Sequence, residues 1–422
     1  MKHKIREDMD MKKTIKFGIF GYRRGEDYYK SVLANNGSIV AVCDKSEDRL
    51  ALAKEELGNI ATYTNFEDFI NHPDLEAVFL CNYFNEHTKY AIRALEKDIH
   101  VLTECTSNAT MAEGVALVRA AEKSKAIFMI AENYPYMIFN KEMKRVYDGG
   151  SLGRCLYAEG EYNHPIDPEE IESITKYRPY KTHWRNTLPR AYYITHSLGP
   201  LMYITGAFPK RVTAFGVYTP DLKDGLGGLY VGDSVAIITT LNDDDSVFRV
   251  TGCAAFGAHE RSYRICGMNG QIENLRDGSN MVSLRYNSWQ IPEGLQESQS
   301  YAPSWNDPES AMIQSTGHGG SDYLVIREFF GCIRENRRPF FDVYCATTMA
   351  SVAILAHRSL LENGKPYDIP DFRREEDRVL YENDNLTPFY AEDGSEPTLP
   401  STSHPDYTPS ADKIENYLKF FK

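Results

Sequence analysis

The feature that most constrains this fold is a regular alternation of strands and helices over residues 14 to 130. Short runs that are apolar throughout, such as TIKFGIF (14–20), alternate with amphipathic segments such as SEDRLALAKEEL (46–57). Unbroken apolar strands are typical of a parallel sheet whose two faces are covered by helices. The pattern predicts further strands at 38–44, 77–82, 100–104 and 126–133, and further helices at 87–98 and 111–124.

A glycine turn follows the first strand. In a dinucleotide fingerprint, G-x-G-x-x-G, one glycine makes the turn, a second lets the backbone approach phosphate, and a third lets the helix pack on the strand. Gly21 can make the turn, but Arg23 stands where the second glycine would be, and the next glycine is Gly25. Arg23 and Arg24, beside a helix N-terminus, can hold a pyrophosphate by charge and through backbone N–H groups. The alternative is an ordinary turn with solvated arginines.

Asp44 ends the second strand. An acidic group at this place accepts hydrogen bonds from the adenosine ribose and repels a 2′-phosphate, which favours NAD over NADP. The alternative is an aspartate that only caps the next helix, although Ser46 can do the same. Strand, glycine turn, helix, strand and acid in this order predict a Rossmann domain over residues 14–133.

The alternation of short apolar strands with helices ends at about residue 134. Longer, alternating runs such as CLYAEGEYNH (155–164) and DSVAIITTLN (233–242) indicate an open, mostly antiparallel sheet. Helices are expected at about 138–148, 189–205, 320–335 and 346–364. We therefore expect an α/β fold, in which an α+β domain for substrate binding and oligomerisation (134–371) follows the Rossmann domain. A flexible lead (1–13) and an extended C-terminal tail (372–422) with a short terminal helix complete the chain.

Composition narrows the class of protein. The net charge of −13 disfavours sequence-independent nucleic-acid binding, because phosphate would be repelled. No apolar run is long enough to span a membrane, and the polar N-terminus lacks the apolar core of a signal peptide. The eight scattered cysteines form no C-x-x-C pair, which indicates reduced thiols and a cytoplasmic location. The histidines show no ligand spacing such as H-x-x-x-H, so we expect no metal.

The segment FLCNYFNEHTKYAIRALEKDIHVLTECTSNATMAEGVALVRAAEKS (79–124) resembles the third to fifth units of the Gfo/Idh/MocA family of sugar and inositol oxidoreductases. In that family the loop after the fourth strand reads Glu-Lys-Pro, and its lysine is usually taken as catalytic. Here the loop reads Glu104-Cys105-Thr106, so the lysine and the proline are both missing. This departure disfavours an ordinary sugar dehydrogenase.

One branch of the family also lacks the lysine. It contains NAD-dependent glycoside hydrolases, whose known members include α-N-acetylgalactosaminidases. Several segments of this chain resemble it: AENYPY (131–136), EGEYNHP (159–165), HWRNTLPRAYYITHSLGPLMYITG (183–206), GHGGSDY (317–323) and NGKPYDIPDF (363–372). The resemblance covers about residues 14 to 375, although residues 218–310 match no recognised motif.

Two Tyr–His pairs are the candidate acid/base groups. Tyr162 and His164 lie two apart on a predicted strand, and Tyr193 and His196 lie three apart on a predicted helix, so each pair shares a face. Phenol and imidazole are suitable acid/base groups for sugar hydroxyls. Each pair can equally be half-buried structure with satisfied hydrogen bonds. The resemblance implies catalytic roles for these four residues and a role for Glu132 in positioning NAD or the sugar. We expect cofactor contacts also at Gly21, Arg23, Arg24, Asp44, Asn82 and Glu104. Arg185 and His318, which lies in a glycine loop that exposes its side chain, are the expected substrate contacts.

The resemblance implies redox-neutral glycoside cleavage, in which NAD transiently oxidises carbon 3 of the sugar and the group on carbon 1 leaves by elimination. A net sugar or inositol dehydrogenase is the first alternative, and a non-catalytic sugar-binding protein is the second. Because relatives pair their open sheets face to face, we expect a homodimer or homotetramer.

Overall fold

The computed structural model describes residues 13–166, 180–222 and 228–419, which fall into two compact units. The first unit contains residues up to Asn108, Glu113–Met137 and Trp305–Thr347; the second contains Ala109–Ala112, Ile138–Ser304 and the chain from Thr348. We expected one boundary at 133/134, whereas residues 305–347 return to the first unit. The reason is aromatic packing, because Phe329 and Phe330 meet Phe17 edge-on with ring centroids 6.5 and 5.4 Å away.

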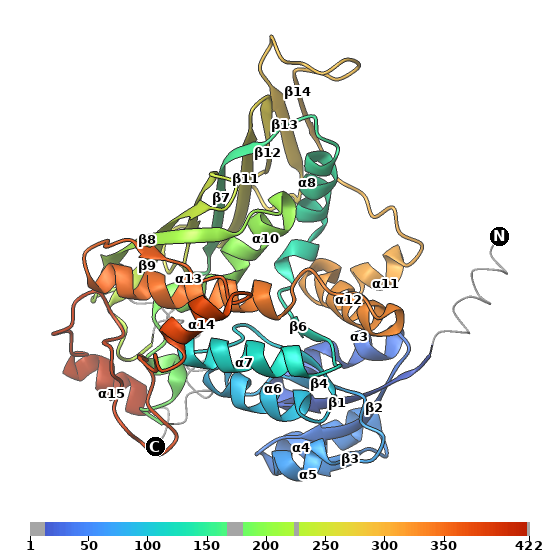
Figure 1. Cartoon of the computed structure of the whole chain (residues 1–422), viewed down its shortest axis with the longest axis vertical. Helices are drawn as coiled ribbons and strands as arrows, with labels where there is room; N and C mark the ends of the chain where they lie inside the picture. The colour runs from blue at the N-terminus through green and yellow to red at the C-terminus, as the bar shows by residue number, and fades with distance from the viewer. Residues whose placement is uncertain (1–12, 167–179, 223–227, 420–422) are drawn as a thin grey trace. The chain divides into compact units, whose positions relative to one another are not determined.

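The first unit contains a six-stranded parallel sheet in the order β3-β2-β1-β4-β5-β6 (Figure 1). Its strands are β1 (Ile15–Phe20), β2 (Gly37–Cys43), β3 (Ala61–Tyr63), β4 (Ala77–Leu80), β5 (His100–Thr103) and β6 (Phe128–Ile130). This order confirms the predicted Rossmann domain. From β1 the strand order runs outward to β3 on one side, and from β4 it runs outward to β6 on the other side. The switch point therefore lies between β1 and β4, and ligands bind beyond the carboxyl ends of the strands at such a point.

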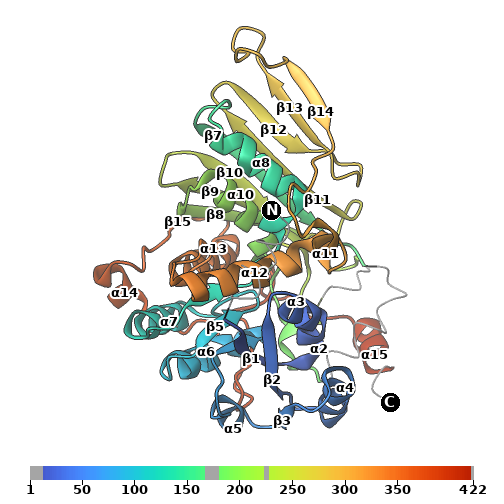
Figure 2. The same ribbon diagram turned by 90° about the vertical axis from the view of Figure 1, so that its right-hand side faces the viewer.

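Helices of the first unit include α2 (Tyr22–Gly25), α3 (Tyr29–Ala34), α4 (Glu47–Leu57), α5 (Phe66–Ile70), α6 (His87–Leu95), α7 (Met111–Lys123), α11 (Ser310–Gln314) and α12 (Ser321–Glu335) (Figure 2). Helix α4 begins at the predicted cap, where the Ser46 hydroxyl accepts a hydrogen bond from the Arg49 N–H. The short β3 and α5 were not predicted, because five or fewer residues carry little periodicity.

The second unit contains a nine-stranded sheet in the order β14-β13-β12-β11-β7-β10-β9-β8-β15. Its strands are β7 (Cys155–Asn163), β8 (Pro209–Tyr218), β9 (Asp233–Asn242), β10 (Val247–Thr251), β11 (Glu260–Gly267), β12 (Gly270–Asn274), β13 (Val282–Tyr286), β14 (Ser298–Tyr301) and β15 (Tyr367–Asp368). Among these strands only β7 and β10 pair in parallel. The predicted open, mostly antiparallel sheet is therefore confirmed.

One face of this sheet is covered by α8 (Ile138–Asp148) and α10 (Thr195–Thr205), as both views show (Figures 1 and 2). The close approach of α10 depends on Gly160, where a Cβ atom would lie 2.1 Å from the Ser197 carbonyl oxygen. The expected helix over 189–205 is split. Arg190–Tyr192 form a 3-10 turn after Pro189, and α10 begins only at Thr195. In the same sheet β11 and β12 form a hairpin, and β10 ends at Thr251.

The C-terminal residues belong to the second unit and do not form a separate extended tail. Helix α13 (Val343–Leu361) contributes Arg358, which binds both carboxylate oxygens of Asp384 at 2.6 and 2.8 Å. Phe389 is buried against Tyr192, with ring centroids 5.2 Å apart. Two more helices follow, α14 (Glu375–Tyr381) and α15 (Ala411–Lys419), and α15 is the predicted terminal helix. The acidic, proline-rich composition of this segment is typical of an exposed tail. Contacts between residues far apart in the sequence leave no local pattern, so the composition did not reveal this packing. No helix in the described ranges is both long and apolar enough to cross a membrane.

Candidate active site

The glycine turn after β1 is built around two glycines with different roles. Gly21 adopts φ 94°, and a Cβ atom there would lie 2.6 Å from the backbone of Cys81, at the end of β4. Gly25 has ordinary helical φ, but its Cβ would lie 2.2 Å from the Ile19 side chain. Gly25 therefore plays the part of the third fingerprint glycine, letting helix pack on strand. Arg23, at the place of the second glycine, is exposed.

Asp44 and Asn82 flank this turn. The Asp44 carboxylate accepts hydrogen bonds from the backbone N–H groups of Tyr22 and Ser46, both at 2.8 Å. It thus holds the glycine turn, while Ser46 and not Asp44 caps the next helix. The remaining lone pairs of Asp44 can still accept from a ribose. The Oδ1 atom of Asn82 is buried without a hydrogen-bond partner among the described residues. A left-handed glycine cradle beside an unsatisfied amide oxygen fits a bound dinucleotide.

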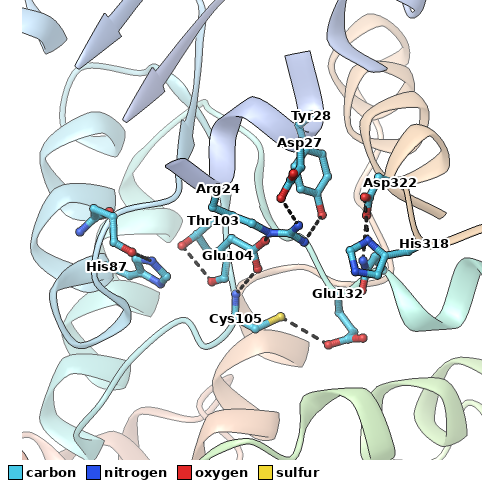
Figure 3. Close-up of polar contacts among 12 residues, drawn as sticks. Arg24, Asp27, Tyr28, His87, Thr103, Glu104, Cys105, Glu132, His318 and Asp322 are labelled. Atoms are coloured by element: carbon cyan, nitrogen blue, oxygen red, sulfur yellow. Dashed lines mark hydrogen bonds and ion pairs between the residues drawn. The ribbon is translucent and has the colours of Figure 1, made fainter. Parts of the chain in front are cut away.

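Arg24 and Glu104 hold each other across the carboxyl ends of the strands (Figure 3). The guanidinium donates to Glu104 at 2.6 Å, to Asp27 at 2.8 Å and to the Tyr28 hydroxyl at 3.2 Å. Burial opposes its charge, but the pKa of Arg24 is raised by Tyr28 and by the carboxylates of Glu104 and Asp322. Both residues were expected to contact the cofactor. In this structure they bind each other beside the turn, and their contact with the cofactor stays a prediction.

The loop that lacks the family lysine brings a thiol to a buried carboxylate. The Cys105 thiol donates to Oε2 of Glu132 at 3.3 Å, and the Tyr134 N–H donates to Oε1 at 3.1 Å. The Glu132 side chain is fully buried. His87 holds the same loop from behind, because its two ring nitrogens lie 2.9 Å from the Thr106 carbonyl oxygen and 3.2 Å from that of Asn82. Burial lowers the pKa of His87, as expected for a structural histidine.

His318 of the first unit is oriented by a buried acid. Its Nδ1 atom lies 2.8 Å from Oδ2 of Asp322, whose other oxygen accepts from the Asn133 amide at 2.8 Å. Burial disfavours the Asp322 carboxylate, but the hydrogen bond and charge of His318, with Arg24 and Asn133, lower its pKa. Asp322 and Asn133 were not predicted as site residues; their only sequence signal was that they lie within the GHGGSDY and AENYPY segments.

The four predicted catalytic residues converge within the second unit. Tyr162 is 4% exposed, and its ring centroid lies 5.4 Å from His164, 5.8 Å from Tyr193 and 5.2 Å from His196. The rings of Tyr193 and His196 are 5.4 Å apart. The sequence had suggested that Tyr193 lies on the helix with His196, but Tyr193 precedes that helix. The two pairs thus form one cluster, which we call the Tyr–His cluster.

A short segment after β10 fixes the cluster. The Cys253 N–H donates to the Tyr193 carbonyl oxygen at 3.1 Å, and the Ala254 N–H donates to that of Tyr162 at 2.9 Å. Ala254 in turn accepts from the His164 N–H at 2.8 Å. This segment lies in the region where no motif was evident from sequence. The same region supplies His259, whose ring stacks on His164 with centroids 4.8 Å apart.

Arg185 lies in a 3-10 turn (Trp184–Asn186), with its guanidinium 4.4 Å above the Trp184 ring. It lines a small pocket with Arg190, Gly228, Cys253 and Tyr193 of the Tyr–His cluster. The predicted substrate contact of Arg185 stays a prediction. Within the described ranges, no group of three His, Cys, Asp or Glu side chains gathers as metal ligands would.

Two family models and several known proteins match parts of this chain. Residues 15–132 match the model of the oxidoreductase family with an NAD-binding Rossmann fold, and residues 231–377 match that of the glycosyl hydrolase 109 C-terminal domain. The glycosyl hydrolase family 109 protein of Saccharopolyspora erythraea is 28% identical over 395 residues, which cover 86% of this chain and 84% of that protein. The family 109 protein of Streptomyces niveus is 27% identical over 400 residues, covering 87% and 79%.

Solved structures show the same fold. Levoglucosan dehydrogenase in complex with NADH and levoglucosan matches with a TM-score of 0.70 at 16% identity, covering 85% of this chain and 100% of that one. Aldose-aldose oxidoreductase from Caulobacter crescentus, complexed with glycerol, matches with a TM-score of 0.65 at 18% identity, covering 85% and 100%.

Proposed function

We propose that this chain, which belongs to the Gfo/Idh/MocA oxidoreductase family and carries a glycosyl hydrolase 109 C-terminal domain, is an NAD-dependent enzyme that cleaves glycosides without net oxidation. The observation that carries the proposal is the Tyr–His cluster, in which Tyr162 contacts His164, Tyr193 and His196. Phenol and imidazole groups suit proton transfers to and from sugar carbons and oxygens.

The first unit supplies the cofactor site. Gly21 makes the turn, Asp44 accepts from the ribose, Asn82 offers its amide oxygen, and Arg23 adds positive charge near the phosphates. Bound NAD supplies a hydride acceptor that is regenerated as the reaction closes, so that the sugar is oxidised at carbon 3 only transiently. Glu132 positions the cofactor or the sugar from its buried place behind Cys105.

The second unit supplies the proton chemistry. A ketone at carbon 3 acidifies the proton on carbon 2, and a base of the Tyr–His cluster removes it. A second group of the cluster protonates the oxygen that leaves carbon 1. This route does not use the paired carboxylates of most glycosidases, and the cluster offers phenols and imidazoles in their place. Arg185, in the pocket beside Tyr193, holds a sugar hydroxyl or carboxylate.

A net sugar dehydrogenase is the second candidate. The fold is shared with levoglucosan dehydrogenase and with an aldose-aldose oxidoreductase, which favours it. The two candidates differ in their products, because a dehydrogenase releases reduced nucleotide, whereas a redox-neutral glycosidase releases the aglycone alone.

The deciding experiment follows both products in one assay. The protein is purified without added nucleotide, denatured, and its NAD and NADP are quantified. The folded protein is then offered a panel of 4-nitrophenyl glycosides and free sugars, with nitrophenol and reduced nucleotide recorded together. We expect stoichiometric NAD, and nitrophenol without accumulating reduced nucleotide. Accumulating reduced nucleotide would favour the dehydrogenase. A protein that neither retains nor binds NAD would contradict both and favour a non-catalytic sugar-binding role.

We further propose a homo-oligomer in the cytoplasm. Phe215 is 59% exposed on β8, where it pairs in register with Ile237 of β9, so that face carries apolar surface. A homodimer or homotetramer would cover it. All eight cysteines are free thiols, which fits a reducing compartment.

A further inference from the structure

The first unit holds an imidazole–carboxylate pair with the geometry of an acid/base group. Oδ2 of Asp322 accepts from Nδ1 of His318 at 2.8 Å, and the Asp322 side chain is fully buried whereas that of His318 is 36% exposed. A carboxylate on Nδ1 fixes the tautomer, with the proton on Nδ1 and a lone pair on Nε2. Within the described part of the chain, Nε2 has no hydrogen-bond partner. The ring therefore presents a base to whatever approaches its exposed side.

The loop around His318 is shaped for this contact. His318, Gly319 and Gly320 have positive φ values of 51°, 64° and 98°. A Cβ atom at Gly317 would lie 2.4 Å from Oδ2 of Asp322, so only glycine leaves the carboxylate room to reach the ring. The Ser321 hydroxyl donates to the His318 carbonyl oxygen at 2.8 Å. Left-handed backbone at a non-glycine residue costs free energy and persists where the surrounding structure enforces it.

Residues 132–134 connect this pair to the loop that lacks the lysine. Figure 3 shows the contacts at the two ends, Cys105 with Glu132 and His318 with Asp322. Asn133 donates to Asp322 at 2.8 Å. On one side of it, Glu132 accepts from the Cys105 thiol at 3.3 Å. On the other, the Tyr134 ring centroid lies 6.4 Å from that of His318. Residues 132–134 thus hold both the Cys105 loop and the His318–Asp322 pair in one arrangement.

We propose that His318 is the base that takes the hydroxyl proton when the sugar is oxidised, and that Asp322 and Asn133 are positioning residues. The inference rests on the proposed function. The O–H bond breaks and its proton moves to Nε2, while two electrons leave the same carbon as hydride for bound NAD; the imidazolium returns the proton when the hydride comes back. Asp322 stabilises the imidazolium. His318 thereby takes the role of the missing lysine, while the Tyr–His cluster keeps the proton transfers at carbons 1 and 2.

The test measures the first half of the reaction alone. Full-length protein with NAD bound is mixed with excess 4-nitrophenyl N-acetyl-α-galactosaminide, or with whichever compound of the panel the wild type uses, and reduced nucleotide is followed in a single turnover. Compounds with hydrogen or deuterium at carbon 3 report whether this step limits the rate. The variants are His318→Ala, Asp322→Asn and, as a matched control, His72→Ala. His72 is also partly exposed, with Nδ1 2.9 Å from the Tyr63 hydroxyl.

For His318→Ala we expect unchanged NAD content and nucleotide reduction slowed roughly 10²- to 10⁴-fold, with the rate partly restored by added imidazole. Asp322→Asn should slow the same step with His318 present, because the amide donates to Nδ1 and moves the ring proton to Nε2. The deuterium effect should rise in both variants. His72→Ala should behave as wild type.

Two results would overturn the assignment. One is nucleotide reduction by His318→Ala at the wild-type rate. The other is a slow variant that imidazole does not rescue and whose deuterium effect stays at the wild-type value, since that pattern indicates a structural role. A wild-type protein that reduces its nucleotide with no compound contradicts the proposed function instead.

Discussion

At the scale of single residues, this site depends on glycines, whose lack of a side chain lets neighbouring backbone and side-chain atoms come close. Gly21 brings the turn against the Cys81 backbone, Gly25 brings helix against Ile19, and Gly317 admits the Asp322 carboxylate. At each position a methyl group would collide with an atom that is part of the site or its support. The departure from the G-x-G-x-x-G fingerprint is therefore confined to the middle glycine, and the turn and packing functions are retained.

Gly21→Ala tests the turn. The new Cβ would lie 2.6 Å from the Cys81 backbone at a φ of +94°, so we expect the variant to lose NAD and about 2 kcal/mol or more of stability. NAD content after purification and the urea midpoint measure the two effects. Gly206→Ala is the matched control, because Gly206 is left-handed with φ +76° and ψ 0° and nothing lies within 4 Å of a Cβ there. It should lose about 1 kcal/mol and keep its NAD. Equal NAD content in both variants would contradict the cofactor role of Gly21.

At the scale of secondary-structure elements, the C-terminal segment supports the helices and turns that carry the site. His357 of α13 donates from Nε2 to the Pro400 carbonyl oxygen at 2.8 Å. Asn186, next to Arg185, donates its amide to the Tyr417 hydroxyl of α15 at 2.9 Å. Ser403 donates to the Asp233 carboxylate at the start of β9. These contacts make residues beyond 372 part of the second unit.

The His357 contact predicts a loss of stability in mild acid. Burial lowers the pKa of His357 to about 4, with the Arg358 charge acting in the same direction and the Pro400 hydrogen bond opposing it. The unfolded chain takes up the proton near its ordinary pKa of about 6.5. Stability is therefore fully present above about pH 6.5 and is lost as the pH falls toward 4, by up to about 3 kcal/mol from this group.

The urea midpoint, measured between these pH values, checks this expectation. His357→Gln removes the titrating group and should flatten the profile by that amount. If the wild type and His357→Gln show the same slope, the neutral buried imidazole is not the cause.

Tyr417→Phe tests whether α15 supports the Arg185 turn. Without the Tyr417 hydroxyl, the Asn186 amide remains hydrogen-bonded to the carbonyl oxygens of Tyr180 and Lys181 at 3.2 and 3.3 Å. We expect about 1 kcal/mol less stability and a higher KM with little change in kcat, because the turn carries Arg185, which we propose binds substrate without taking part in the chemistry. Tyr407→Phe is the control, since that hydroxyl accepts from Lys413 and not from the turn. A KM that rises equally in both variants would indicate a general loosening of the C-terminal segment.

At the scale of the whole molecule, the open sheet of the second unit needs a cover. Phe215→Glu places a charge on the proposed contact face, and we expect light scattering to show a smaller species that still contains NAD. Leu33→Glu, at a 50% exposed residue of the first unit, should leave the assembly unchanged. A wild-type protein that is already monomeric would exclude the proposed assembly.

Much of the secondary structure could be predicted from local sequence patterns. Hydrophobic periodicity and apolar runs predicted the six-stranded sheet apart from β3, and the helices α4, α6, α7, α8 and α12. They could do so because periodicity is a property of neighbouring residues. The same reasoning placed Tyr162 with His164, since two residues apart on a strand share a face. It also singled out Tyr193 and His196, although Tyr193 lies outside the helix expected for it.

Tertiary structure alone decided which distant groups meet. Asn133 and Asp322 lie 189 positions apart, and their contact follows from the return of residues 305–347 to the first unit. The commitment of Arg24 to Glu104, the anchoring of the Tyr–His cluster by residues 253 and 254, and the packing of the C-terminal segment are of the same kind. Such contacts depend on how elements pack, which no local period records. The sequence by itself therefore determined the elements and the residue types for the chemistry, whereas only the folded chain decided which acid orients which base.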